Sequence, residues 1–230
     1  MSIEKRRRTD IASTVLKPLQ PSDAELMNRL PELAYLFVFH RDGFVRELAL
    51  DQMQELQSPF YVAALAFRLN DWVAQVRAAA VRCAERVFPN TAANELANAS
   101  LFLLGRPFAW GRWSDETEAL DKALSRYDVA DAREGILRNA RSESMGAILR
   151  YASRWEAMDR HLDGLATRAF LPPVRGAAFQ ELIEGFARWP VGWRKESTDR
   201  IYAQFRLIRQ YDERPILPSR PLESLVEQAA

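Results

Sequence analysis

The chain has 230 residues, of which 48% are hydrophobic and 27% are charged, and its formal net charge is +1. This length and composition predict one sizeable globular domain and exclude an intrinsically disordered chain. The near-zero net charge also argues against the global basic field that steers proteins to nucleic acid.

The first elements predicted along the chain are short helices. Residues 1–20 read as a flexible basic segment, after which Ser22 or Asp23 begins a helix. Pro31 interrupts or restarts that helix before a second helical stretch over Leu33–Phe39. The next helix is expected over Pro59–Arg68, with one apolar stripe formed by Phe60, Ala63, Ala64 and Phe67.

A longer amphipathic helix follows Asp71, which is a favoured N-cap residue. Apolar residues then recur three and four positions apart, as one face of a helix requires, at Val76, Ala79, Ala80, Cys83 and Val87. Two short helices joined by a tight turn cannot bury an apolar face alone, so we expect each pair to stack on its neighbours.

The remaining chain predicts further helix pairs, an irregular stretch at 106–113 and a proline-rich C-terminal tail over 212–230. Trp189–Trp193, which contains Pro190 and Gly192, reads as a rigid turn packed against the last helix. Helices are expected from Ala92 to Gly105, after Ser114 as a cap, over Ala130–Asn139, Ser142–Ser153, as a pair within Trp155–Glu184, and over Thr198–Tyr211.

A Val-Arg-x-x-Ala motif occurs three times, beginning at Val45, Val76 and Val174. The starts are separated by 31 and 98 residues, and 98 is close to three times 32 or 33. One helical-repeat period therefore accounts for all three copies. We expect the valines, and the alanines at Ala49, Ala80 and Ala178, to be buried at equivalent places on second helices.

These residues resemble the HEAT-repeat family, whose second helix commonly carries an aspartate, then Val-Arg, then a small residue. Asp71, Val76, Arg77 and Ala80 match this pattern in full. The resemblance implies an all-α fold, a right-handed superhelical solenoid of about five to six HEAT-like helix pairs over residues 21–211. Stacked second helices line the concave surface of such a solenoid.

The sequence shows neither the long apolar run of a membrane-spanning helix nor the pattern of a signal peptide. No apolar run approaches 18 residues, and the basic cluster Lys5–Arg8 is followed by mixed sequence rather than by the apolar part of a signal peptide. Cys83 is the single cysteine, which excludes an intramolecular disulfide. We therefore expect a monomer of the reducing cytoplasm without membrane contact.

Arginine outnumbers lysine 28 to 4, which raises the question of anion recognition. Arg82 and Arg86 lie one turn apart beside the core face, and a shift by 31 residues places Asp51 and Glu55 at the equivalent positions of the preceding repeat. Pairing between repeats is the simpler role for these arginines. A role in contacting a partner from the concave surface stays open.

The cluster of aromatic residues Phe102, Phe108, Trp110 and Trp113 is the most unusual local feature. Packing at an irregular repeat is the favoured explanation, and an aromatic anchor for a partner is the alternative. Alkylpurine DNA glycosylases built from HEAT-like repeats are similar in size and use tryptophans with an aspartate. That resemblance would make Trp110, Trp113 and Asp115 the residues of interest.

Catalytic chemistry finds little support in the sequence. The two histidines, His40 and His161, lie on different predicted repeats and outside any metal-ligand spacing. Helical carboxylates such as Glu181 and Glu184 are too common to be nominated as an acid-base pair. We expect no catalytic residue, metal or cofactor.

The function predicted is therefore non-catalytic binding of a protein partner, as an adaptor, scaffold or inhibitor, including the toxin-neutralising immunity type. A DNA-binding or DNA-repair protein that resembles the glycosylases is the alternative. The residues expected to contact a protein partner are Arg82, Arg86, Arg46, Arg77, Trp110 and Trp113.

Overall fold

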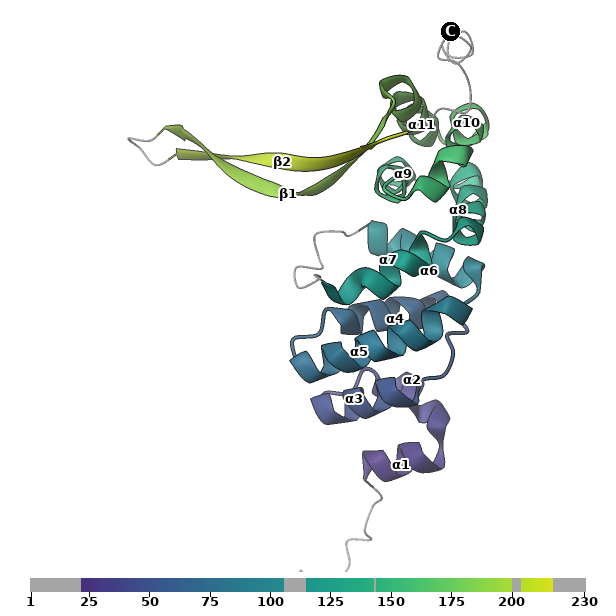
Figure 1. The fold of residues 1–230 in the computed structure, drawn as a ribbon, viewed down its shortest axis with the longest axis vertical. Coiled ribbons are helices and arrows are strands. Elements are labelled where there is room, and N and C mark those ends of the chain that lie inside the picture. The colour runs from purple at the N-terminus through teal and green to yellow at the C-terminus, as the bar shows by residue number, and fades with distance from the viewer. Residues whose placement is uncertain (1–21, 106–114, 143, 200–203, 217–230) are drawn as a thin grey trace, which may run out of the picture.

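The computed structural model describes residues 22–105, 115–142, 144–199 and 204–216 (Figure 1). Helices account for most of these residues, as the sequence predicts. Two long antiparallel strands follow the last helix and form a small sheet, which the sequence analysis did not anticipate.

The N-terminal helices begin where the sequence places them. Ser22 caps the first helix, and a reciprocal bond between the Ser22 backbone and the Glu25 side chain completes a capping box. Asp42 caps the third helix through the Phe44 N–H. The elements are α1 (Asp23–Arg29), η1 (Pro31–Leu33), α2 (Ala34–Phe37), α3 (Gly43–Gln52), α4 (Pro59–Leu69), α5 (Ala74–Val87) and η2 (Phe88–Asn90).

The helices of the second half lie close to their predicted positions up to residue 184. Ser114, the expected cap, lies outside the described residues. The elements are α6 (Ala93–Leu104), η4 (Asp115–Thr117), α7 (Glu118–Leu124), α8 (Tyr127–Asn139), α9 (Met145–Ala152), η5 (Glu156–Met158), α10 (Asp159–Arg168) and α11 (Pro172–Glu184).

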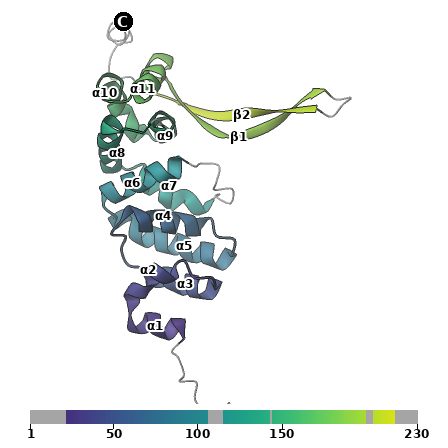
Figure 2. The same ribbon diagram turned by 180° about the vertical axis from the view of Figure 1, so that it is seen from behind.

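The helices stack in two layers along one direction, with α1 at one end and α10 and α11 at the other (Figures 1 and 2). In one layer α4 contacts α6, α6 contacts α8, and α8 contacts α10. In the other, α3 contacts α5, α5 contacts α7, and α9 contacts α11. Each inner helix thus buries apolar surface against the elements before and after it, which no single helix pair could do.

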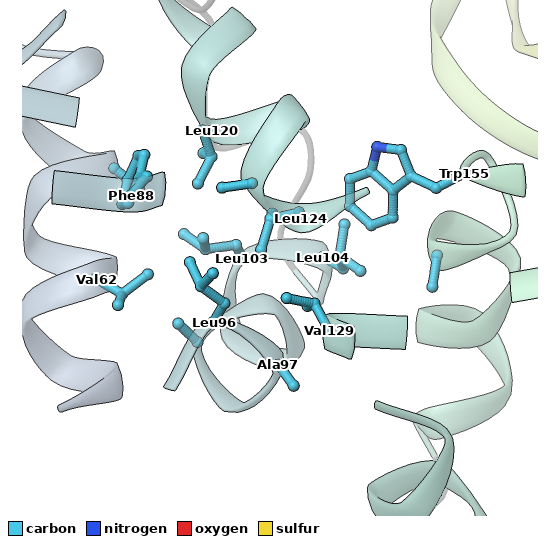
Figure 3. Packing of buried hydrophobic residues seen from close by; sticks show 14 of the residues in the cluster. Val62, Phe88, Leu96, Ala97, Leu103, Leu104, Leu120, Leu124, Val129 and Trp155 are labelled. Carbon is cyan, nitrogen blue, oxygen red and sulfur yellow. The ribbon is translucent and has the colours of Figure 1, made fainter. Parts of the chain in front are cut away.

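Small and branched apolar side chains from successive helices fill one continuous core (Figure 3). The expected motif positions Val76, Ala80, Val174, Ala49 and Ala178 are fully buried in it. Val45 is half-buried and packs against the core edge. The burial predicted for the Val-Arg-x-x-Ala motif is therefore confirmed, with Val45 less enclosed than expected.

The apolar stripe predicted for the helix over Pro59–Arg68 does lie on one face of α4, but its two phenylalanines stay exposed. Phe60 is 61% exposed and Phe67 is 49% exposed, whereas Val62, Leu65 and Leu69 of the same helix are fully buried. Both sets are spaced three and four apart, so periodicity alone could not decide which face turns inward. The packing of α4 selects the aliphatic set and leaves the phenylalanines outside.

The described residues from 186 to 215 form two paired strands, so the predicted helix over Thr198–Tyr211 is wrong. Strand β1 (Phe186–Asp199) pairs antiparallel with β2 (Gln204–Pro215), and the hairpin projects sideways from the helical stack (Figures 1 and 2). Trp189–Trp193 lies within β1 rather than in a turn, and the register shifts between Pro190 and Gly192. Strand β2 also continues past residue 211, where the sequence analysis began a separate tail.

Gly185 and Arg214 fix the base of the hairpin to the helices. Gly185 ends α11 with a φ of 72°, a left-handed conformation that glycine adopts without strain. Arg214 forms an ion pair with Asp159 and donates to the carbonyl oxygens of Ser153 and Arg154. These contacts tie β2 to the C-terminal end of α9 and to the start of α10.

Candidate functional site

The arginine of each Val-Arg motif binds the turn that precedes its own helix. The Nη1 atom of Arg46 donates to the carbonyl oxygens of His40 and Arg41, at 2.9 and 3.0 Å. Arg175 repeats this arrangement with the carbonyl oxygens of Ala169 and Phe170. Arg77 donates to the Asp71 carbonyl at 2.9 Å. The motif therefore recurs because each turn between paired helices exposes carbonyl groups that need a donor.

Asp71 and Arg46 also join two successive helix pairs. The guanidinium of Arg46 donates to both carboxylate oxygens of Asp71, at 3.1 and 2.9 Å, and both side chains are buried. Arg68 contributes a second ion pair at 2.5 Å. Burial opposes ionisation of Asp71, but the Val73 N–H and the two arginines outweigh it and lower the Asp71 pKa.

This cluster corrects two expectations. Asp71 does not cap α5 directly, because the N-cap residue is Val73, whose N–H the Asp71 side chain accepts. Arg46 has only 3% of its surface exposed, which leaves a partner no surface to contact. Arg77 is partly buried and pairs with Glu116 at 3.2 Å, so it too serves contacts between helix pairs.

Arg82 and Arg86 both reach back to the preceding helix of their layer, α3, but only one of them binds the predicted partner. Arg82 pairs with Asp51 at 3.0 Å, as the 31-residue shift predicts. Arg86 does not pair with Glu55; its Nη2 atom donates to the carbonyl oxygens of Leu50, Asp51 and Met53. These carbonyls end α3, where a helix leaves acceptors unpaired and carries partial negative charge.

We expect the loss of Arg86 to cost more stability than the loss of Arg82. Arg86→Ala leaves partly buried carbonyls without a donor and should destabilise the protein by about 1–3 kcal/mol. Arg82→Ala removes an exposed pair and should cost about 0–1 kcal/mol. Urea denaturation of both variants measures the difference. Glu55→Gln is the control, and a strong coupling between Glu55 and Arg86 would contradict the geometry.

The two predicted tryptophans fall outside the described residues. Trp110 and Trp113 lie within 106–114, and the side chain of Asp115 is likewise not described. The aromatic-anchor and glycosylase-like expectations that rest on them stay predictions. Phe102 of the same sequence cluster is described and is about half exposed on α6.

A groove of about 360 Å³ lies between α4 and α6, on the face opposite to the buried side of α4. Four half-exposed or exposed phenylalanines surround it, and Asn98 is the one polar residue in its wall. The rings of Phe39 and Phe60 lie 5.5 Å apart. The lining residues are Phe39, Pro59, Phe60, Ala63, Ala64, Phe67, Asn98, Ala99 and Phe102.

Sequence reasoning missed this groove because it placed the phenylalanines of α4 on an apolar stripe without establishing which face of the helix is exposed. A signal was present, since Phe60 and Phe67 are seven residues apart and stand opposite an equally apolar aliphatic stripe. A helix that is apolar on two faces either lies deep in a protein or has a second contact surface. Large contiguous apolar surface of this kind is typical of interaction sites.

Arg133 is a buried cation at the centre of the stack. It donates to Ser100 Oγ at 3.0 Å and to the Leu124 carbonyl at 3.1 Å, and its guanidinium lies 4.9 Å from the centre of the Trp155 ring. Burial, with a smaller contribution from Arg154, lowers the Arg133 pKa to about 9. These contacts join α6, α7 and α8, so we assign Arg133 to packing rather than to ligand recognition.

The described residues contain no cluster of histidine, cysteine and carboxylate side chains suited to a metal ion. His161 lies 2.9 Å from Asp131, and burial lowers its pKa. His40 lies 3.4 Å from Asp23 in the turn before α3. None of the helices within the described ranges is long and apolar enough to cross a lipid bilayer.

Comparisons of the chain with models of protein families, with curated proteins and with solved structures find no match.

Proposed function

We propose that the protein is a non-catalytic protein-binding module of the HEAT-like type, a right-handed solenoid that acts as an adaptor, scaffold or inhibitor. The layered contacts between α3 and α5 and between α4 and α6 support a repeat architecture. The Asp71 to Arg46 ion pair between successive helix pairs, at the motif positions, supports the resemblance.

The phenylalanine groove between α4 and α6 is the observation that carries the binding function. The occupant we propose is the apolar face of a helix from a partner protein. Phe60 and Phe67 stand two helical turns apart, which matches the spacing of anchors along an amphipathic helix. The lining carries no charged side chain, so docking of an apolar helix face removes no charged group of the groove from water.

Affinity capture from the native source with mass spectrometry tests this proposal. The double variant Phe60→Ser and Phe67→Ser should reduce recovery of the partner more than tenfold, because aromatic anchors commonly contribute about 2 kcal/mol or more each. Leu207→Ser is the matched control, since it removes apolar surface of similar exposure from the hairpin. Recovery should be insensitive to salt.

Two outcomes would redirect the assignment. Loss of the partner only on charge reversal at Arg82 and Arg86 would place the binding surface on the second helices, as the sequence analysis predicted. Salt-dependent retention on duplex DNA, with no protein partner recovered, would favour the DNA-binding alternative.

The hairpin is the feature that favours that alternative. A two-stranded ribbon fits the major groove of DNA. The described hairpin side chains include exposed cations, among them Arg194, Lys195 and Arg206. Acidic residues alternate with them, and Arg188 is already paired with Glu213 at 2.8 Å. The apolar groove therefore remains the stronger basis for a function.

A further inference from the structure

A cavity of about 380 Å³ lies at the junction of α9, α11 and the base of the hairpin. Strand β1 follows α11 directly in sequence and contacts both α11 and α9. The volume is within the range of small-molecule sites, roughly 300–1,000 Å³. The lining residues are Ala147, Arg150, Tyr151, Gln180, Glu181, Glu184, Phe186, Arg188, Pro190, Arg209 and Tyr211.

Two of the lining residues are more than nine-tenths buried and carry polar atoms without a well-formed hydrogen bond. The hydroxyl of Tyr151 and both carboxylate oxygens of Glu181 lack a well-formed hydrogen bond among the described residues. The Ser153 hydroxyl interacts with Glu181 but donates to the Leu149 carbonyl at 3.0 Å. Buried polar groups are almost always hydrogen-bonded in folded proteins, so three such atoms on facing helices need an explanation. A ligand that donates hydrogen bonds supplies one.

The rim of the cavity carries three exposed arginines and one exposed carboxylate, that of Glu184. Arg150 and Arg209 are exposed, and the structure holds both in place: Arg150 donates to Gln180 at 3.0 Å, and the Arg209 guanidinium lies 5.2 Å from the centre of the Trp193 ring. Arg188 stands at the same rim in its ion pair with Glu213. Guanidinium groups arranged in this way recognise carboxylates.

Apolar side chains make up the rest of the cavity lining. Ala147 of α9, Phe186 and Pro190 of β1 and the ring of Tyr211 line this part. The cavity thus offers hydrogen-bond acceptors in its interior, cations at its mouth and an apolar wall. A matching ligand combines an ammonium group, a carboxylate and an apolar side chain.

We propose that the cavity binds a free α-amino acid with an apolar side chain, whose ammonium group is held by Glu181 and Tyr151 and whose carboxylate is held by Arg150 and Arg209. An ammonium group has three N–H donors, and the lining residues Glu181 and Tyr151 together carry three oxygen atoms without a well-formed hydrogen bond. The site is separate from the groove between α4 and α6, so its failure leaves the protein-binding proposal standing.

Binding an ammonium group should release a proton from Glu181. Burial raises the Glu181 pKa to about 8, so the free protein holds this side chain mostly neutral at pH 7. A bound cation favours the carboxylate, and the proton passes to the buffer. The charged and titratable groups around Glu181 are Arg150 and Tyr151 of α9, Asp159 of α10, Glu184 of α11, and Arg209, Tyr211 and Arg214 of β2.

Isothermal titration calorimetry with L-leucine and two analogues tests the proposal. We expect L-leucine to bind at least tenfold more tightly than 4-methylpentanoate, which lacks the ammonium group, and than isoamylamine, which lacks the carboxylate. In buffers of different ionisation enthalpy at pH 7, L-leucine should show release of close to one proton. Equal affinities for the three compounds, or no binding of any of them, would overturn the proposal.

Glu181→Gln separates a ligand site from a structural role. Because the pKa of Glu181 is higher in the folded than in the unfolded protein, the free energy of unfolding should fall as the pH rises from 4.5 toward 8. The Glu181→Gln variant should not show this fall. We expect the variant to be more stable than the wild type at pH 8 yet at least tenfold weaker for L-leucine. Glu95→Gln on α6 is the control for both measurements. Unchanged leucine affinity in Glu181→Gln would leave only a structural role.

Discussion

Replacing Asp71 by asparagine should destabilise the protein by about 3–5 kcal/mol, because breaking a buried ion pair from one side leaves its partner charge uncompensated. Here two guanidinium groups lose their counter-ion, since Arg46 and Arg68 both pair with Asp71 and both are largely buried. Asparagine retains the shape of the side chain and can still accept the Val73 N–H. The loss therefore measures charge rather than volume.

The effect of Asp71→Asn should depend on pH in one direction. The folded-state pKa of Asp71 lies below its ordinary value of 3.8, so its stabilisation is complete above that value and is lost as the pH falls through the folded-state pKa. The difference in free energy of unfolding between the wild type and Asp71→Asn, measured by urea denaturation, should thus become smaller at acidic pH. Asp51→Asn, in the exposed pair with Arg82, should cost no more than about 1 kcal/mol. Similar costs for the two variants would contradict the burial of the Asp71 cluster.

The sequence predicted the burial of Val76 and Ala80 well because the Val-Arg-x-x-Ala pattern is local and repeated. A helix that begins directly after the turn at Asp71 places Val76 and Ala80 on its buried face. The same start brings Arg77 within reach of the Asp71 carbonyl. Both consequences follow from helical geometry within a few residues. The pairing of Arg82 with Asp51 required only the additional assumption of a regular repeat.

Arg86 shows where this reasoning fails. The repeat shift correctly brings it to the end of α3, but sequence shows side chains and not the carbonyl groups that a helix leaves free at its end. An acidic residue at the matching position was therefore the wrong partner. Partner choice depends on whether α3 ends before or after Glu55, and helix ends are difficult to place from sequence.

The hairpin was missed for a different reason. Phe205, Ile208 and Tyr211 are three residues apart and therefore fit one face of a helix. In the structure this segment is a strand, and Trp193 pairs with Arg209 and Lys195 with Leu207 across the hairpin. Such cross-strand contacts join residues that are distant along the chain, so no short window of sequence reveals them. The cavity beneath the hairpin was consequently invisible, and Glu181 read as an ordinary helical carboxylate.

Gly146→Ala should destabilise the protein, although alanine is the better helix former by about 1 kcal/mol. Gly146 lies in α9, where a Cβ atom would stand 2.7 Å from the backbone oxygen of Pro173 and 3.0 Å from its carbonyl carbon. These are backbone atoms of α11, so no side chain can rotate to relieve the clash and the two helices must separate. Overpacking of this kind costs about 1–3 kcal/mol.

Gly176→Ala in α11 is the matched control, because a Cβ atom there meets nothing within 4 Å. That substitution should stabilise the protein by about 0.5–1 kcal/mol, so thermal unfolding should show midpoints that move in opposite directions for the two variants. The direction in which the Gly146→Ala midpoint moves also bears on the cavity. Its walls include α9 and α11, and the close approach of Gly146 to Pro173 sets the spacing of these two helices. A rise in midpoint for Gly146→Ala would mean that α9 and α11 lie further apart, and the site assigned to Glu181 and Tyr151 would lose its geometric basis.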